Sequence, residues 1–243
     1  MATPGIARTR GLTAYWLFNP AIGSSLSGPP VELAASIGIF SRIVSTNRAM
    51  KCGKKNKMNS EQRLSARVSL IPMSSGRDEE FAQMLDEFRD AGELDIYKGQ
   101  FAVAWKGNEA FYTLLSRMKA GGYPTPEIVP MDSYFIQAEG RILGELYIRH
   151  RLSPRLEQVG GHIGYKVRPS CRNQGVATTA LSLALQQLGG MGIERALVTC
   201  HVDNRPSARV IEKCGGIRIS DAVTEQGVEL RYWVATAPVT RDP

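Results

Sequence analysis

Hydrophobic positions recur with a clear period only after about residue 65 of the chain. The segment RVSLIP, which starts at Arg67, alternates between apolar and polar residues as a strand does. Apolar residues then recur at i, i+3, i+4 and i+7 from Phe81 to Phe88, and Gly92 ends this predicted helix. The same spacing recurs from Phe111 to Met118 before Pro124. The pattern therefore predicts one strand followed by two amphipathic helices.

The second half of the chain predicts strands and helices in alternation. Two strand-like runs, SYFIQ and RILGELYIRH, flank the turn AEG and indicate a β-hairpin. The predicted elements that follow are a strand over 162–167, a helix over 174–188, a strand over 195–200, a helix over 204–214 and a strand over 228–234. This order predicts an α/β (α+β) fold, a mixed sheet with helices on both of its faces.

The first 65 residues differ in composition from the rest of the chain. They are rich in Gly, Ser, Pro and Ala, show no sustained period, and include the basic run KCGKKNK over 51–57. We expect a flexible basic N-terminal extension over 1–65, one folded domain over 66–237 and a short tail over 238–243. The extension could be an organelle transit peptide, but an over-extended start, with Met58 as the true beginning, is the favoured interpretation.

The position of the basic residues weakens a nucleic-acid interpretation of the net charge of +7. Residues 1–57 hold eight basic residues and a single acid, Glu32, so this segment alone carries the excess and the remainder is neutral. A folded domain that binds a duplex needs its basic excess on the surface that meets phosphate. We therefore expect no nucleic-acid binding by the folded domain.

The four cysteines, Cys52, Cys171, Cys200 and Cys214, form no Cys-x-x-Cys pair and lack histidines at metal-ligand spacing. They predict reduced thiols and no metal site. No apolar run reaches the roughly 18 to 20 residues that span a bilayer. We expect a soluble, cytoplasmic protein that does not bind membranes.

The segment from Gly161 to Leu181 carries the chemical signal. A strand ends at Val167, Pro169 interrupts its hydrogen-bonding pattern, and a short loop leads into a helix at Gly175. Such a loop presents unpaired N–H groups and the positive end of a helix dipole, a favourable site for a diphosphate. Taken alone, an Arg-x-x-Gly-x-Ala pattern is a weak signal, because many helices begin in this way.

A second strand, turn and helix, over 198–216, strengthens this interpretation. Asn204 is a natural N-cap residue and Pro206 falls in the first helical turn. A capped surface helix would explain these residues individually. It would not explain why this helix follows the helix that begins at the loop, with a single strand between the two.

Together these segments resemble the GNAT superfamily of N-acetyltransferases. The resemblance rests on Arg172, Gly175 and Ala177 in the loop, and on Asn204 with the later Glu-Lys-x-Gly over 212–215. It is closest to an uncharacterised predicted-acetyltransferase branch with Gly-His-Ile-Gly-Tyr (161–165), Thr-Cys before Asp-Asn (199–204), and Arg-Tyr-Trp (231–233). The resemblance implies a GNAT-like, mostly antiparallel central sheet over roughly 68–234.

The resemblance also implies direct acetyl transfer from acetyl-CoA to a primary amine of a small molecule or peptide. The pantetheine arm would meet strand backbone near Tyr165 and Val167, and Asn204 and Ser207 would contact the cofactor from the far side. The diphosphate would lie on the loop residues Arg172, Asn173, Gln174, Gly175, Val176, Ala177 and Thr178. Homodimers occur in such proteins, but no pattern in this sequence demonstrates one.

An alkyl amine with a pKa near 10 must lose a proton before it can attack. His162 is the first candidate base, because it lies where many relatives carry a carboxylate, and its equally weighted alternative is a packed structural histidine. Glu145 is the second candidate. His150 lies an odd number of residues from Glu145, so the two should face opposite sides of the sheet. His201 is expected at the surface.

One departure from the family concerns the proton donor. Many relatives place a tyrosine immediately before the Glu-Lys pair, and this chain has Ile211 there. A thiol with a pKa near 8.5 is a tolerable leaving group without a donor, so transfer is still feasible. Covalent acetyl transfer through Cys200 or Cys214 is disfavoured, since neither has a recognisable basic partner.

Two alternative functions are consistent with the same residues. The first is an acyl-CoA-binding module with little or no catalytic activity, which Ile211 motivates. The second is an interaction protein whose basic arm contacts acidic partners or RNA. Acids near the first predicted helix, Asp86, Glu87, Asp90 and Glu93, could attract a cationic amine or form that helix's solvated side.

Overall fold

The computed structural model describes residues 67–93, 108–121, 129–225 and 227–236. The extension over 1–65, the tail over 238–243 and the possible start at Met58 lie outside these ranges. The described elements, in chain order, are β1 (Ser69–Pro72), α2 (Asp78–Asp90), α4 (Asn108–Lys119), β2 (Met131–Ala138), β3 (Arg141–Arg149), α5 (Pro154–Gln158), β4 (Ile163–Val167), η3 (Pro169–Cys171), α6 (Val176–Gly190), β5 (Arg195–His201), α7 (Arg205–Lys213), β6 (Ile217–Arg218), β7 (Ala222–Thr224) and β8 (Gly227–Ala235).

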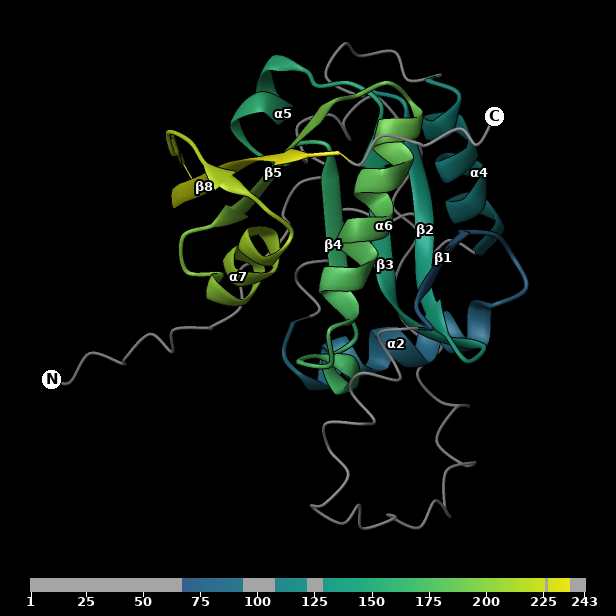
Figure 1. Ribbon diagram of the computed structural model, residues 1–243. Coiled ribbons are helices and arrows are strands. Elements are labelled where there is room, and N and C mark those ends of the chain that lie inside the picture. Colours follow the sequence, from purple (N-terminus) through teal and green to yellow (C-terminus); the bar gives the residue numbers. More distant parts are fainter. Residues whose placement is uncertain (1–66, 94–107, 122–128, 226, 237–243) are drawn as a thin grey trace, which may run out of the picture.

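The strands form two antiparallel sheets. The first has the order β1-β2-β3-β4, and the second has the order β5-β8-β6 with β7 also paired to β8. The predicted hairpin is β2 and β3, and its tight turn uses Glu139 and Gly140 at φ of 53° and 76°. Such positive φ values suit the twist of a two-residue hairpin turn. Figure 1 shows β5 and β8 running obliquely to the strands of the first sheet.

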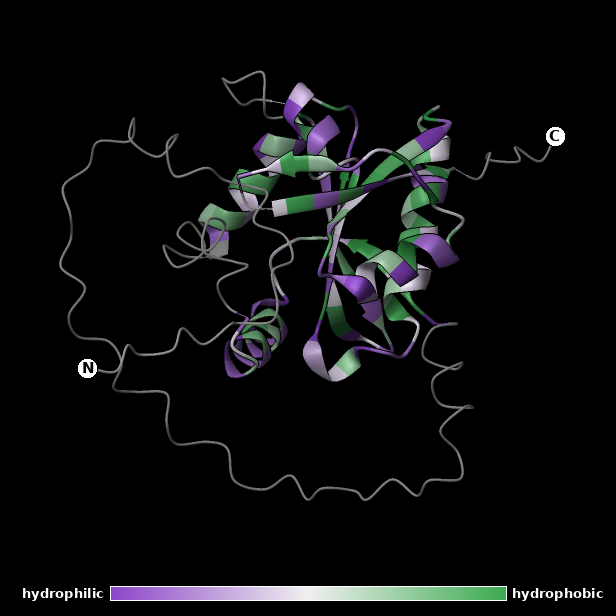
Figure 2. Ribbon diagram, turned by 90° about the vertical axis from the view of Figure 1, so that its left-hand side faces the viewer, coloured by the Kyte–Doolittle hydropathy of each residue, from purple (hydrophilic) through white to green (hydrophobic). Residues whose placement is uncertain are grey.

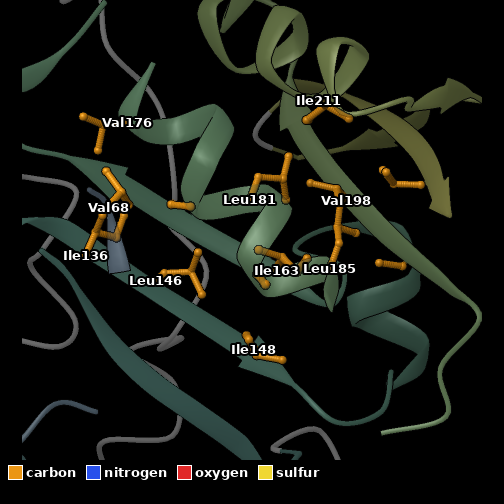
Figure 3. Close-up of a cluster of buried hydrophobic side chains, with 14 of the residues drawn as sticks. Val68, Ile136, Leu146, Ile148, Ile163, Val176, Leu181, Leu185, Val198 and Ile211 are labelled. Carbon is orange, nitrogen blue, oxygen red and sulfur yellow. The ribbon is translucent and has the colours of Figure 1, made fainter. Parts of the chain in front are cut away.

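One core lies between the sheets and helices α6 and α7. It contains Ile136, Leu146 and Ile163 from the first sheet, Val198 from β5 and Leu181 from α6, all fully or almost fully buried. Figure 3 shows these side chains between α6 and the strands. Burying each such side chain is worth about 1.5–3 kcal/mol, so this core anchors α6 firmly on the strands.

A second core covers the opposite face of the first sheet. Phe81 and Phe88 of α2 and Phe111 of α4 pack on Phe135 and Tyr147, and the rings of Phe81 and Phe135 lie 5.4 Å apart. Figure 2 shows the matching alternation of hydrophilic and hydrophobic residues along the helices. Helices therefore cover both faces of the sheet, as the sequence predicts, and the two predicted amphipathic helices are α2 and α4.

Several short elements have no counterpart in the predicted order. Helix α5 begins at Pro154, and the Ser153 side chain accepts a hydrogen bond from Leu156 N–H, which caps its first turn. Strands β6 and β7 have two and three residues and pair only with β8 among the described strands. These elements are too short to show a hydrophobic period.

Candidate active site

The two sheets meet at the start of β4 and β5. His162 N–H donates to Leu197 O at 2.7 Å, and Leu197 N–H donates to His162 Nδ1 at 2.9 Å. Gly161 makes this contact possible, since its φ is +55° and a Cβ there would lie 2.2 Å from Leu197 O. Beyond this joint β4 pairs with β3 and β5 pairs with β8, so each strand has an edge open to the gap between the sheets.

The backbone of β4 presents hydrogen-bonding groups to this gap. Arg168 N–H donates to Leu143 O of β3 at 2.8 Å, and Lys166 lies opposite Glu145 in the ladder. Because successive residues of a strand direct their N–H and C=O groups to opposite sides, Tyr165 and Val167 direct theirs away from β3. These are the two strand residues that the sequence assigns to the pantetheine arm.

A turn with unusual backbone angles leads from β4 into α6. After the 3-10 turn η3, Asn173 has a φ of 60° and Gly175, the N-cap of α6, has a φ of 78°. Thr179 N–H donates to Gly175 O at 3.1 Å, the first bond of the helix. The N–H groups of Val176, Ala177 and Thr178 therefore have no acceptor within the helix. Together with the positive end of the helix dipole, these groups suit the diphosphate that the sequence predicts for this loop.

Carboxylates from α2 and its C-terminal end bind the basic side chains of this loop. Glu87 accepts from Arg168 Nε at 2.7 Å and from Ser170 N–H at 3.2 Å. Beyond the helix, Glu93 accepts from both terminal nitrogens of Arg172, at 2.7 and 2.6 Å. Both acids therefore bind the loop, so neither one contacts only solvent. Figure 1 shows α2 crossing below the lower ends of β4 and α6.

Hydrogen bonds from the loop also affect the ionisation of Glu87. Burial opposes ionisation of Glu87, but its hydrogen bonds from Ser170 and Arg168 outweigh this and hold its pKa below the usual value. The Arg172 guanidinium is further held by donation from Nε to Val167 O at 3.0 Å. Gln174 completes the loop by donating from Nε2 to Ser170 O at 3.0 Å.

Helix α7 approaches the gap from the side of β5. Asn204 caps the helix as predicted, because its Oδ1 accepts from Ser207 N–H at 3.2 Å. The Ser207 hydroxyl is buried and lies 2.9 Å from the Tyr165 hydroxyl. Burial raises the pKa of Tyr165, so this phenol keeps its proton. A hydroxyl pair therefore connects β4 with α7.

Ile211 has no access to the gap. Its side chain is fully buried among the apolar residues that separate α7 from α6 and β5, as Figure 3 shows. A Cβ on Gly216 would lie 2.6 Å from Ile211 Cγ2, so this packing is tight. The position that carries a tyrosine in many GNAT enzymes is therefore a core position here.

The two candidate bases lie in different environments. His162 uses Nδ1 to accept from Leu197 N–H, so its neutral ring carries the proton on Nε2. Burial and the nearby Arg149 guanidinium lower its pKa from 6.5 to about 4. Arg149 is itself buried and donates to Gly160 O and Gly161 O, each at 3.0 Å. This geometry is that of a histidine that holds the joint between β4 and β5.

Glu145 faces the side of the sheet covered by α2 and α4. It is fully buried, and its Oε1 accepts from Lys166 Nζ at 2.8 Å. Its Oε2 has no hydrogen-bond partner within the described ranges. His150, in contrast, follows β3 and pairs with Asp132 at 2.8 Å. Glu145 is thus held in a fixed orientation through one oxygen, and its other oxygen is buried without a partner in the described ranges.

The cysteines near the gap are poor nucleophiles. Burial raises the pKa of Cys200 to about 12, and burial also raises the pKa of Cys214. A thiol with such a pKa is protonated at neutral pH, and the thiolate is the nucleophilic form. Cys171 is also a buried free thiol. The geometry therefore offers no support for a covalent acetyl carrier.

The fold brings the predicted cofactor residues together around one gap. Strand residues Tyr165 and Val167, the loop over 172–178, and Asn204 with Ser207 on α7 border it from three elements. Sequence reasoning missed the roles of Arg149, Arg168, Ser170 and Lys166, because each acts through a partner distant in the chain. Among the described residues, no group of His, Cys, Asp and Glu side chains could hold a metal ion.

A family model described as "Acetyltransferase (GNAT) domain" matches residues 67–217, more than half of the chain. The chain belongs to the GNAT acetyltransferase family. This membership confirms the predicted fold class and the predicted acetyl-CoA donor at the level of the family. Among curated proteins, no sequence matches this GNAT chain.

Solved structures share this GNAT fold at low sequence identity. RimJ of Mycobacterium smegmatis with CoA-disulfide has a TM-score of 0.54 and 17% identity, over 72% of this chain and 85% of that one. RimL, a ribosomal L7/L12 alpha-N-protein acetyltransferase in complex with coenzyme A, has a TM-score of 0.52 and 14% identity, over 71% and 96%. The microcin C7 self-immunity acetyltransferase MccE, in complex with acetyl-CoA and AMP, has a TM-score of 0.50 and 14% identity, over 70% of this chain and 92% of that one. Within the described part of this GNAT protein, no helix is both long and apolar enough to cross a membrane.

Proposed function

We propose that this protein transfers an acetyl group from acetyl-CoA to a primary amine of a small molecule or peptide by direct attack. The observation that carries the proposal is the gap between β4 and β5, which opens at the His162–Leu197 joint beside an anion-binding loop. Acetyl-CoA supplies an activated acetyl group when bound. The free cysteines are consistent with a cytoplasmic location, and homodimerisation stays a prediction.

The residues around the gap fit acetyl-CoA. The N–H groups of Val176, Ala177 and Thr178 would hold its diphosphate, because they have no acceptor within α6 and lie at the positive end of the helix dipole. The backbone groups of Tyr165 and the N–H of Val167, which are directed away from β3, would bind the amides of the pantetheine arm, whereas the Val167 carbonyl accepts from Arg172 Nε. The same backbone N–H groups can stabilise negative charge that develops on a carbonyl oxygen.

We assign the general base to Glu145. An amine with a pKa near 10 needs an acceptor for its proton at neutral pH, and Glu145 Oε2 is unpartnered among the described residues. Lys166 fixes the carboxylate through the other oxygen. His162 fits this role less well, since protonation of Nδ1 would break its bond from Leu197 N–H. We assign His162 to positioning β4 against β5.

We assign proton donation to the departing thiolate to the Ser207 hydroxyl. Ser207 is the buried hydroxyl at the start of α7 that faces β4, and Tyr165 lies 2.9 Å from it. Tyr165 keeps its own proton and orients the Ser207 hydroxyl through the hydrogen bond that the two hydroxyls share, and Ser207 would recover its proton from water once CoA has left. This pair would replace the tyrosine that many relatives carry at the position of Ile211.

An acyl-CoA-binding module without turnover is the second candidate function. It is favoured by Ile211, whose side chain is buried in the core and contributes no proton donor. This candidate predicts the same cofactor binding as the enzyme. It differs in predicting no release of free CoA with any amine.

Titration calorimetry with acetyl-CoA tests the cofactor site. Gly175→Asp would place a carboxylate at the loop and strain a residue whose φ is 78°, so binding should be lost. Gly192→Asp is the matched control, because Gly192 has a φ of +81° and open space around it. Equal loss of binding in both variants, or no binding by the unmodified chain, would contradict the proposed cofactor site.

An amine panel then separates the enzyme from the binding module. Amino acids, polyamines and peptides with free N-termini are incubated with acetyl-CoA, and released thiol is measured. Release that depends on both the amine and Glu145 supports acetyl transfer. Tight binding of acetyl-CoA with no release on any amine supports the binding module instead.

A further inference from the structure

Two carboxylates bind the cofactor loop, one on α2 and one three residues beyond its end, and they meet different kinds of partner. Glu87 accepts from Arg168 and from Ser170 N–H, which build the loop. Glu93 instead accepts from both terminal nitrogens of Arg172, the charged side chain of the loop itself. The contacts of Glu87 hold the loop in shape, whereas Glu93 binds the guanidinium of Arg172, the group that would bind an anion.

Glu87 is tied to a buried charge. Arg168 is 6% exposed and, besides Glu87, donates from Nη1 to Ile142 O at 3.3 Å. Removing the carboxylate would leave a buried guanidinium without its acid, which is strongly unfavourable. The loop would move to restore solvation, and its N–H groups would lose their common direction.

Glu93 occupies the fork of the Arg172 guanidinium. The planar fork matches carboxylate and phosphate equally well, so one anion excludes the other from the same two nitrogens. The pair is partly solvated, with side-chain exposures of 38% for Arg172 and 21% for Glu93, which permits exchange. Arg172 also lies over the Phe88 ring, 5.6 Å from its centroid, and donates to Val167 O. Its stem is therefore positioned beside the loop whichever anion it binds.

We propose that Glu93 competes with the diphosphate of CoA for Arg172, and that Glu87 is the positioning residue that keeps the loop ready to bind it. The inference rests on the proposed acetyl-CoA site. Exchange of Glu93 for diphosphate releases the residues that follow α2 from Arg172, while Glu87 keeps α2 itself in contact with the loop.

Two isosteric substitutions on the same segment have opposite expected effects. Glu93→Gln removes the competing charge, so CoA binds about two- to fivefold more tightly, the range of a partly exposed ion pair. Glu87→Gln loosens the loop, and CoA binds about tenfold more weakly. Asp86→Asn is the matched control for net charge, because Asp86 pairs with Arg89 on the exposed side of α2.

The measurement is calorimetric titration of the full chain and these variants with CoA and, separately, with pantetheine. Pantetheine lacks the diphosphate, so Glu93→Gln leaves its affinity unchanged while improving that of CoA. In an Arg172→Ala background, Glu93→Gln no longer improves CoA binding. Urea unfolding of Glu87→Gln verifies that the variant is folded under the titration conditions.

Three results would overturn the inference. The first is a gain from Glu93→Gln no larger than that from Asp86→Asn, and the second is an equal gain for pantetheine. The third is a gain that persists without Arg172. Failure of the unmodified chain to bind CoA would instead overturn the proposed function, so the two failures are distinguishable.

Discussion

The buried neutral state of His162 predicts that acid destabilises this protein in a defined pH window. Its pKa is 6.5 in an unfolded chain and about 4 in the folded protein. Between these values the unfolded state binds more protons than the folded state, so stability falls as the pH is lowered from 6.5 towards 4. His162→Asn removes this titration, while the Asn Oδ1, which lies where Nδ1 of the histidine does, can still accept from Leu197 N–H.

The size of the effect follows from the difference between the two pKa values. Each pKa unit corresponds to about 1.4 kcal/mol, which gives an upper limit of about 3.4 kcal/mol for His162. Solvent screening of the ring reduces this, and we expect about 2 kcal/mol between pH 7 and pH 4. Above pH 7 both states of His162 are neutral, and its contribution is constant.

Urea unfolding at half-unit intervals from pH 4 to pH 8 measures the effect. The free energy of unfolding of the unmodified chain should fall more steeply with acid than that of His162→Asn. The difference between the two curves should change by about 2 kcal/mol and level off above pH 7. Parallel curves across the whole range would refute the assignment of His162 as a buried neutral residue of the joint.

Four further outcomes test the site and its scaffold. Glu145→Gln should lower kcat about 10²- to 10⁴-fold and leave the acetyl-CoA Kd within about twofold in calorimetry, whereas a larger loss for His162→Asn would reverse the two assignments. Ser207→Ala should lower kcat about tenfold or more with little change in the calorimetric Kd; unchanged turnover would exclude it as the donor. Gly161→Ala should destabilise the fold by about 2 kcal/mol or more in urea unfolding, because of its positive φ and the close Leu197 oxygen. Ile211→Ala should cost about 2–5 kcal/mol of stability through the cavity it leaves, and a loss of turnover without a change in stability would contradict its purely structural role.

The local elements of this protein were largely predictable from the chain. The 3.6-residue period around Phe81 and Phe111, and the alternation in the hairpin, each depend on residues within one or two turns or strands. The loop before α6 was predictable for the same reason, since Pro169 and Gly175 act on their own backbone. Asn204 likewise acts on an amide three residues away.

Long-range partners decided the roles that the sequence left open. His162 was equally consistent with a base and with a packed histidine, and its contact with Leu197, 35 residues away, favours the packed histidine. Glu93 belonged to a group of acids that could have been the solvated side of a helix, but its partner, Arg172, lies 79 residues away. Such pairs leave no periodic signal, because each contact needs the intervening chain to fold first.

The sequence by itself therefore determined the longer elements, the family resemblance and the position of the loop that begins α6. Tertiary structure decided which charged and hydroxyl groups remain available for chemistry. Glu145 has an unpartnered oxygen among the described residues because Lys166, on the neighbouring strand, binds only the other one. Ser207 gains its partner because Tyr165 reaches it from β4. The physical reason is that hydrogen bonding and burial depend on partners that only the folded chain brings together, whereas helix and strand propensity and capping depend on short stretches of the chain.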